Sequence, residues 1–124
     1  MTSLRSVLAL LVLVAATSVV ALSSRLVTSD ENLRVILIVA ERYHFSPSEI
    51  RLRQGEQVIL ELTSEDTIHG FRVPAARLNV TVPSRGRGRT RIRFTAHEKG
   101  RYQFECSRAC GAGHIMMRGT IVVQ

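Results

Sequence analysis

Twelve residues near the carboxyl end of the chain hold most of the side chains that could do chemistry. This stretch, from Cys106 to Met117, reads CSRACGAGHIMM and contains both cysteines, one of the four histidines and two of the three methionines. Its two glycines allow the backbone to fold tightly around whatever these side chains bind. Thiolate, imidazole and thioether groups form a soft set of metal ligands, and a thioether favours copper over zinc. We therefore expect a copper-binding loop.

The spacing within this loop indicates more than one metal ion. A mononuclear blue-copper loop supplies one cysteine, then a histidine and a methionine. Here Cys110 follows Cys106 by four residues, His114 follows after four more, and Met117 after three more. Two thiolates can each bridge a pair of copper ions, which leaves one histidine for each copper. We expect the second histidine to be His69, which lies 37 residues before Cys106 in a polar turn between two apolar runs.

Three segments together resemble the binuclear copper (CuA) domain of cytochrome c oxidase subunit II. They are YHFSP at 43–47, DTIHGF at 66–71 and the run from Cys106 to Val123, which ends in RGTIVV. The match covers roughly residue 33 to the end of the chain, and the combined motif is specific. It is most similar to the short, single-anchor subunit II of B-type haem-copper oxidases. The resemblance implies a cupredoxin fold and electron transfer as the function.

Carried over position by position, the resemblance implies a full set of ligands for two copper ions. These ligands are the bridging thiolates of Cys106 and Cys110, the terminal imidazoles of His69 and His114, the axial thioether of Met117 and the backbone carbonyl of Arg108. The resemblance also implies two protein partners. One is a haem-copper oxidase subunit I-like protein that receives the electron, and the other is cytochrome c or another acidic electron donor.

Position 108 departs from the family's pattern. Many members carry a glutamate there, whose carbonyl binds copper while its carboxylate helps to hold a magnesium ion against subunit I. Arg108 keeps the carbonyl and loses the carboxylate. The copper site is therefore expected to persist, whereas the magnesium bridge, and with it part of the expected contact with subunit I, loses its basis.

The chain also lacks tryptophan, although family members that receive electrons from cytochrome c often present an aromatic side chain near the copper site. The aromatic residues that could take this role are Tyr43, Phe45, Phe71 and Tyr102. The sequence does not choose among them.

Length and composition set the class of fold. With 124 residues the chain has room for one domain, and about 95 remain once the apolar amino-terminal stretch is set aside, enough for a small sandwich core. Aromatic residues make up only 5%, so the core must be built mainly from Val, Ile and Leu, which favours strands. The net charge is +7, and 16 of the 17 basic residues are arginine. Because arginine suits carboxylates and phosphates, we expect acidic partners.

The first 24 residues are expected to form an apolar helix that is either a membrane anchor or a signal peptide. Residues 6–24 carry no charge and lie between Arg5 and Arg25. As a helix rising about 1.5 Å per residue, these 19 residues would just cross the hydrocarbon core of a bilayer. Val19 and Ala21 offer a loose cleavage site, but the long apolar run favours an uncleaved anchor.

A polar tether, residues 25–32, is expected to join this anchor to the CuA cupredoxin domain, residues 33–124. Whether the first 24 residues are an anchor or a signal, the rest of the chain is exported. We therefore expect a membrane-anchored protein whose domain lies on the outer (periplasmic or extracellular) face of the cytoplasmic membrane.

The domain is expected to be all-β, because short runs rich in β-branched residues alternate with turns that contain Gly, Pro, Ser or Asp. The expected strands are Leu33–Ala40, Ile50–Arg53, Gln57–Thr63, Phe71–Val73, Asn79–Val82, Arg89–Thr95, Arg101–Cys106 and Arg118–Val123. No long helical pattern interrupts them. Strands at this spacing predict a Greek-key β-sandwich, which the resemblance identifies as a cupredoxin fold.

One segment has a biased composition. From Ser84 to Arg93 the chain reads SRGRGRTRIR, with arginine at every second position. In a strand these arginines would share one face and repel one another unless something negative lies against them. The segment could be a docking surface for an acidic donor protein or for anionic lipid, or a solvated edge strand protected from aggregation by its charge. Nucleic acid is not an expected partner, because the domain is exported.

The loop has other possible interpretations. Cys106 and Cys110 could form a disulfide in an oxidising compartment. The protein could instead be an exported copper-binding or copper-delivery module, which would bind one exchangeable ion. A structural zinc site of two cysteines and two histidines would use the same residues but leaves Met117 without a role.

Three further side chains of metal-binding types are expected to have no part in the site. His44 is expected at the surface, and His97 in a hairpin turn. Met116 points away from its neighbour Met117, so core packing is its expected role.

Overall fold

Nine short strands form within residues 32–124, the part of the chain that the computed structural model describes, and two short 3-10 turns interrupt them. The strands are β1 (Arg34–Glu41), β2 (His44–Ser46), β3 (Glu49–Leu52), β4 (Gln57–Ser64), β5 (His69–Val73), β6 (Leu78–Val82), β7 (Thr90–Thr95), β8 (Gly100–Glu105) and β9 (Arg118–Val123). The 3-10 turns are η3 (Pro74–Ala76) and η4 (His114–Met116). Leu33–Gln124 forms one compact unit.

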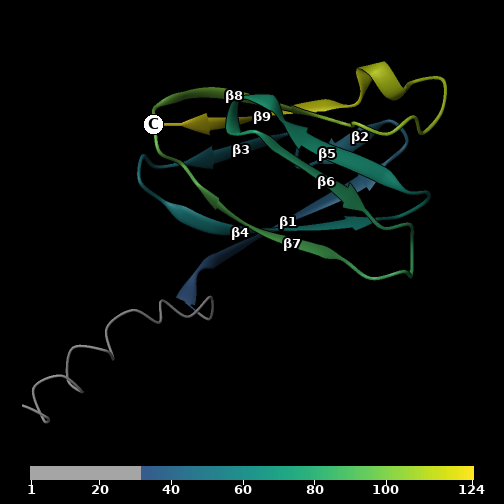
Figure 1. Ribbon diagram of the computed structural model, residues 1–124, viewed down its shortest axis with the longest axis horizontal. Coiled ribbons are helices and arrows are strands. Elements are labelled where there is room, and N and C mark those ends of the chain that lie inside the picture. Colours follow the sequence, from purple (N-terminus) through teal and green to yellow (C-terminus); the bar gives the residue numbers. More distant parts are fainter. Residues whose placement is uncertain (1–31) are drawn as a thin grey trace, which may run out of the picture. The chain divides into compact units, whose positions relative to one another are not determined.

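The strands form two mixed sheets that pack face to face (Figure 1). One sheet has the order β2-β1-β4-β7, and the other has the order β3-β9-β8-β5-β6. The β1–β4 and β3–β9 pairs are parallel, and the remaining pairs are antiparallel. The expected all-β sandwich is therefore confirmed for the described residues.

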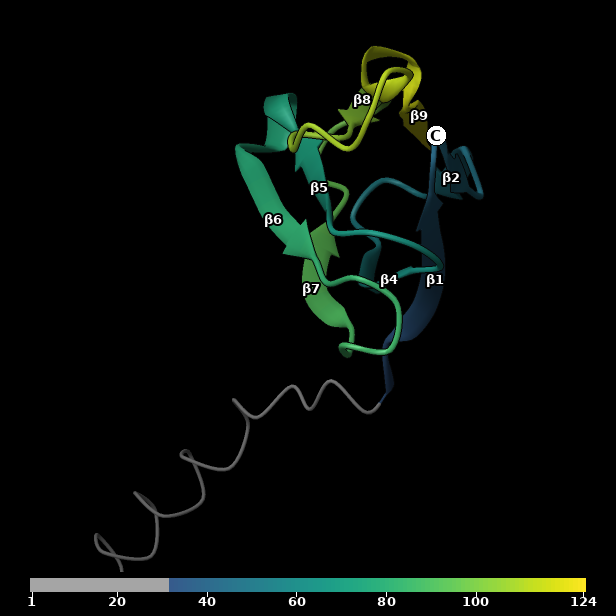
Figure 2. The ribbon, with the colours of Figure 1, turned by 90° about the vertical axis from the view of Figure 1, so that its right-hand side faces the viewer.

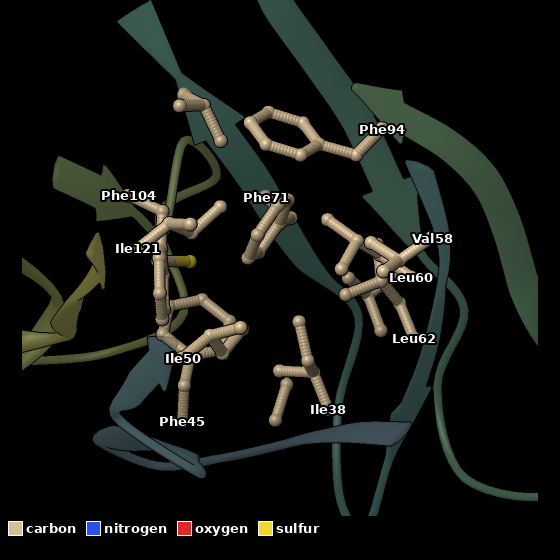
Figure 3. Packing of buried hydrophobic residues seen from close by; sticks show 14 of the residues in the cluster. Ile38, Phe45, Ile50, Val58, Leu60, Leu62, Phe71, Phe94, Phe104 and Ile121 are labelled. Carbon is tan, nitrogen blue, oxygen red and sulfur yellow. The ribbon is translucent and has the colours of Figure 1, made fainter. Parts of the chain in front are cut away.

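The core lies between the sheets, because alternate side chains of each strand point inward. In β4, for example, Val58, Leu60 and Leu62 are completely buried. Phe45, Phe71 and Phe104 meet at the centre, with ring centroids 5.0 to 5.7 Å apart (Figure 3). Ring pairs at these separations add to the stability that burial alone provides. The ligand loop is therefore attached to a stiff, well-packed body.

The expected strands all form, with ends that differ by one or two residues at most. The interpretation missed β2, a three-residue strand that ends just before Pro47 and pairs with the end of β1. It is too short to show a clear alternation of apolar and polar residues. The expected anchor, residues 1–24, and all but the last residue of the tether lie outside the described residues. The helical turns within residues 32–124 have neither the length nor the apolar content of a membrane span.

The arginine-rich segment ends in β7, which is an edge strand of its sheet. As expected, Arg91 and Arg93 share the exposed face of this strand. The negative group that lies against the segment belongs to the chain itself, because Glu61 of β4 forms ion pairs with Arg89 and Arg91. This internal pairing favours the interpretation of a solvated, charged edge strand.

Two ends of the sandwich differ in what they carry. The carboxyl terminus lies at one end, and the segment between β8 and β9 projects from the other, which we call the loop end (Figure 1). Figure 2 views the molecule from the loop end. The turn after β4 also reaches the loop end, and backbone hydrogen bonds join it to its neighbours. Glu65 N–H donates to Ala40 O over 3.1 Å, and Arg85 N–H donates to Asp66 O over the same distance. The turn after β4 is thereby joined to the end of β1 and to the loop between β6 and β7.

Candidate metal centre

His69 lies at the start of β5 and is completely buried. The sequence placed it in a polar turn, and this was wrong, because the turn ends one residue earlier and His69 begins the strand. Strand β5, residues 69–73, pairs with β6, and this pairing fixes the position of the His69 imidazole at the loop end. Its Nε2 lies 2.7 Å from Asp66 Oδ1, and its Nδ1 faces Cys106 Sγ at 3.9 Å. One ring nitrogen is therefore held by the protein, and the other faces a sulfur.

Asp66 holds His69 in this orientation. Its carboxylate accepts hydrogen bonds from the backbone N–H groups of Arg42 (3.0 Å) and Thr67 (2.7 Å) as well as from the imidazole. Burial acts to raise the pKa of Asp66, but the bonds from His69, Arg42 and Thr67 outweigh it and lower the pKa to about 2. An ionised Asp66 keeps the proton on Nε2 and leaves Nδ1 free to bind a metal. Asp66 lies within the segment DTIHGF, but no role for it was predicted from the sequence.

The ligand loop is closed at its base by β8 and β9. Cys106 follows β8 directly, Met117 precedes β9 directly, and Cys106 N–H donates to Met117 O over 3.0 Å. Between them, residues His114–Met116 form the single turn η4, and Met117 N–H donates to His114 O at its end. This turn brings His114 and Met117 to the same side of the loop as the cysteines.

Gly70 allows the loop to lie directly against β5. A Cβ atom at this position would collide with the Ser107 side chain and would lie 2.9 Å from Ser107 N and 3.0 Å from Arg108 N. Real side chains do not approach a backbone so closely, so only glycine fits here without displacing the loop. The glycine next to His69 thus sets the distance between that histidine and the cysteines.

The six expected ligands converge in the structure as two similar groups. Around Cys106 Sγ lie His69 Nδ1 at 3.9 Å and the carbonyl oxygen of Arg108 at 3.1 Å. Around Cys110 Sγ lie His114 Nδ1 at 3.7 Å and Met117 Sδ at 3.9 Å. The two Sγ atoms are 3.9 Å apart. Each sulfur therefore has one imidazole nitrogen and one weak donor beside it.

Both cysteines are buried and free rather than joined as a disulfide. Burial, together with the neighbouring Cys106, raises the pKa of the Cys110 thiol to about 11. The ligand atoms of His69, Cys106 and Cys110 all lie within 4.8 Å of one another, close enough to share a metal ion. Two thiols, two imidazoles and a thioether form a soft donor set that suits copper. The residues present therefore fit the copper site that the resemblance implies.

Of the four aromatic candidates, Tyr43 alone is both accessible and in contact with the ligand loop. Its ring lies where a Cβ atom of Gly111 or Gly113 would stand, and 37% of its surface is exposed. Phe45 and Phe71 are buried in the core. Tyr102 lies away from the loop end and donates its hydroxyl to Glu98 O over 2.9 Å.

The remaining expectations about single residues are mixed. His44 and His97 are exposed, as expected. Met116 was expected to pack in the core, and this was wrong, because it is 75% exposed. The turn η4 points both Ile115 (70% exposed) and Met116 to solvent while Met117 is completely buried. Two adjacent methionines thus have opposite environments.

Solved structures share this fold. One chain of a heme-copper terminal oxidase dimer matches with a TM-score of 0.66 and 23% identity, over 97% of this chain and 97% of that chain. The periplasmic domain of subunit II of cytochrome oxidase from Bradyrhizobium japonicum matches with the same TM-score and 20% identity, over 73% of this chain and 83% of that one. At these identities the likeness concerns the fold.

Comparisons at the level of sequence identify the family as well as the fold. The family model described as a cupredoxin-like domain matches residues 7–123. A cytochrome c oxidase subunit 2 from Thermus thermophilus is 36% identical over 98 residues, which are 79% of this chain and 71% of the relative. Both the fold family and the resemblance noted from the sequence are confirmed by these matches. The chain has a cupredoxin-like domain and belongs to the cytochrome c oxidase subunit 2 family.

Proposed function

We propose that this protein transfers electrons through a binuclear CuA centre, as the subunit of a haem-copper oxidase that first accepts the electron. The observation that carries this proposal is the paired arrangement of ligands at the loop end. Each of two adjacent thiol sulfurs has its own imidazole nitrogen and its own weak donor within 3.9 Å. A single-ion site does not need this duplication, whereas a pair of ions that share two sulfurs does.

In this proposal the thiolates of Cys106 and Cys110 would be shared by the two ions, and the imidazoles of His69 and His114 would each hold one ion. Met117 and the carbonyl of Arg108 would supply the weaker ligands. When bound, the copper pair would take up one electron at a time and pass it on. The chain itself makes and breaks no bond, and its task is to keep the six ligands in one geometry in both redox states.

Several features of the chain support such a rigid site. His69 is completely buried on a strand, and Asp66 fixes the orientation of its ring. Met117 is completely buried, and both cysteines are nearly so. Ligands held by packing and by hydrogen bonds move little when the charge of the metal changes, so little reorganisation accompanies each electron.

The proposal also names the partners and the location. The acceptor would be a haem-bearing, subunit I-like protein in the membrane, and residues 6–24 would anchor this chain beside it, with the domain on the outer face. The donor would be cytochrome c or another acidic carrier. Tyr43 would be the contact through which the electron enters, because it is exposed and touches the ligand loop.

The test is reconstitution of the full chain with copper, followed by metal analysis and electron paramagnetic resonance. We expect two copper ions per chain and a hyperfine pattern shared by two equivalent nuclei. Replacement of either bridging residue, as Cys106→Ser or Cys110→Ser, should abolish the shared pattern, whereas Ser107→Ala between them should keep it. One copper with a localised spectrum would contradict the proposal and favour a copper-delivery module. Preferential uptake of zinc would favour a structural site.

A further inference from the structure

Arg42, in the turn between β1 and β2, bonds both to Asp66, which holds His69, and to Cys110 in the ligand loop. Its side-chain Nε donates to the carbonyl oxygen of Cys110 over 2.6 Å. Its backbone N–H donates to Asp66 Oδ2 over 3.0 Å, and Asp66 Oδ1 lies 2.7 Å from His69 Nε2. A continuous chain of hydrogen bonds therefore joins the two halves of the site through Arg42.

The side-chain bond of Arg42 fixes an exposed part of the ligand loop. Gly111 and Ala112, which follow Cys110, are exposed, and Gly111 has a φ of 140° that few other residues adopt. A glycine-rich segment of this kind is mobile unless something outside it holds it. The bond from Arg42 to Cys110 ties the start of this segment to the body of the sandwich.

The same side chain brings a positive charge to the metal site. Its partner is a carbonyl rather than a carboxylate, so this bond does not neutralise the guanidinium. The carbonyl belongs to Cys110, one of the two residues proposed to bridge the copper ions. A nearby cation stabilises the state that holds one more electron, and the partly buried position of the bond reduces screening by solvent.

We propose that Arg42 is a positioning residue of the copper site with two separable effects. Its Nε hydrogen bond holds the Cys110–His114 part of the loop in place, and its charge raises the reduction potential of the centre. This inference rests on the proposed electron-transfer function. It assigns a role to a residue that the sequence analysis did not single out, because an arginine in a hairpin turn carries no signal of its own.

Three substitutions separate the two effects. In Arg42→Gln, the side-chain nitrogen stands as many bonds from Cα as the arginine Nε, so the hydrogen bond can remain while the charge is lost. In Arg42→Lys, a methylene group replaces Nε, so the charge remains while that bond is lost. Arg42→Met loses both. The backbone bond to Asp66 is kept in all three, and the side chain is largely exposed, so all should fold.

The first measurement is the reduction potential of the copper-loaded chain. We expect a lower potential in Arg42→Gln and Arg42→Met, and a potential near that of the wild type in Arg42→Lys. Arg87→Gln is the matched control, because Arg87 also lies in an exposed turn. It is near Arg85, whose backbone N–H donates to Asp66 O. If Arg42→Gln lowers the potential no more than Arg87→Gln does, the proposed effect of the charge is overturned.

The second measurement is amide hydrogen exchange of residues 110–114 in the metal-free chain. We expect exchange on the order of tenfold faster in Arg42→Lys and Arg42→Met, which is the effect of losing one hydrogen bond from a charged donor. Arg42→Gln should exchange like the wild type. Equal exchange in all four proteins would overturn the proposed effect of the bond, and the proposal requires both effects.

The exchange measurement also separates this inference from the function on which it rests. If the wild type binds one copper or prefers zinc, the proposed function fails, yet exchange in the metal-free chain still decides whether Arg42 holds the loop. If the wild type binds a copper pair while the Arg42 variants behave like it in both measurements, only the inference about Arg42 fails.

Discussion

The two histidines of the site have very different supports. His69 is the first residue of a strand, is completely buried and has its second ring nitrogen bonded to Asp66. His114 begins a single 3-10 turn in the loop and is only half-buried. Its Nδ1 faces Cys110 Sγ at 3.7 Å, much as His69 faces Cys106. The two sulfurs therefore meet similar imidazoles that are held in dissimilar ways.

This difference indicates which half of the site is already formed in the metal-free protein. The His69 half is built into the sandwich, because strand pairing, burial and a carboxylate all fix the same ring. The His114 half depends on the loop keeping its shape, and the metal itself would contribute to that. A site of this kind would combine a preformed inner half around His69 with an outer half around His114 through which copper can enter.

The largest expected effect comes from removing each histidine in turn. His69→Ala should lower the free energy of unfolding of the metal-free chain by about 2–4 kcal/mol, because it leaves a cavity and removes a partner of Asp66. His114→Ala should change the same quantity by less than about 0.5 kcal/mol, as is usual away from the core. Chemical denaturation of the two metal-free variants measures this.

Copper binding provides the matching control for these variants. Both substitutions remove one imidazole, so both should lose the spectrum of a copper pair even though their stabilities differ. Equal destabilisation by the two substitutions would show that the two halves are supported equally, contrary to the comparison.

A second prediction concerns the contact between the halves. Gly70→Ala should destabilise the metal-free chain by about 1–3 kcal/mol, the usual effect of overpacking, because the new methyl group collides with Ser107 and the backbone of Arg108. It should also change the copper spectrum, since the Arg108 carbonyl is a proposed ligand. Gly86→Ala is the control for backbone strain, because Gly86 has a φ of 73° but open space where a Cβ would stand. A Gly70 variant with the spectrum and stability of that control would contradict the close-contact argument.

Much of the fold could be predicted because its signals are local. Alternation of apolar and polar residues in runs such as Thr90–Thr95 marks strands whatever surrounds them. The donor atoms could also be named, since thiols, imidazoles and a thioether at this spacing suit few purposes. The resemblance to a known family supplied the pairing of ligands with metal ions.

The parts that sequence reasoning missed depend on contacts between distant segments. Asp66 holds His69 only because β5 starts where it does, and Arg42 reaches Cys110 across 68 positions of the chain. The burial of Met116 was predicted wrongly for a similar reason. Which of two adjacent methionines faces the core is decided by the turn η4, and nothing in the local sequence reveals that turn.

The smallest expected effects come from those two methionines, which present the same side chain to opposite surroundings. Met117→Leu keeps the buried volume, so the unfolding free energy should fall by less than about 1.5 kcal/mol. The loss of the thioether beside Cys110 should nevertheless change the copper spectrum and the reduction potential. Met116→Leu should leave the stability within about 0.5 kcal/mol and the spectrum unchanged, because that side chain is mostly in solvent. A changed spectrum in Met116→Leu would mean that the outer half of the site is rearranged when copper binds.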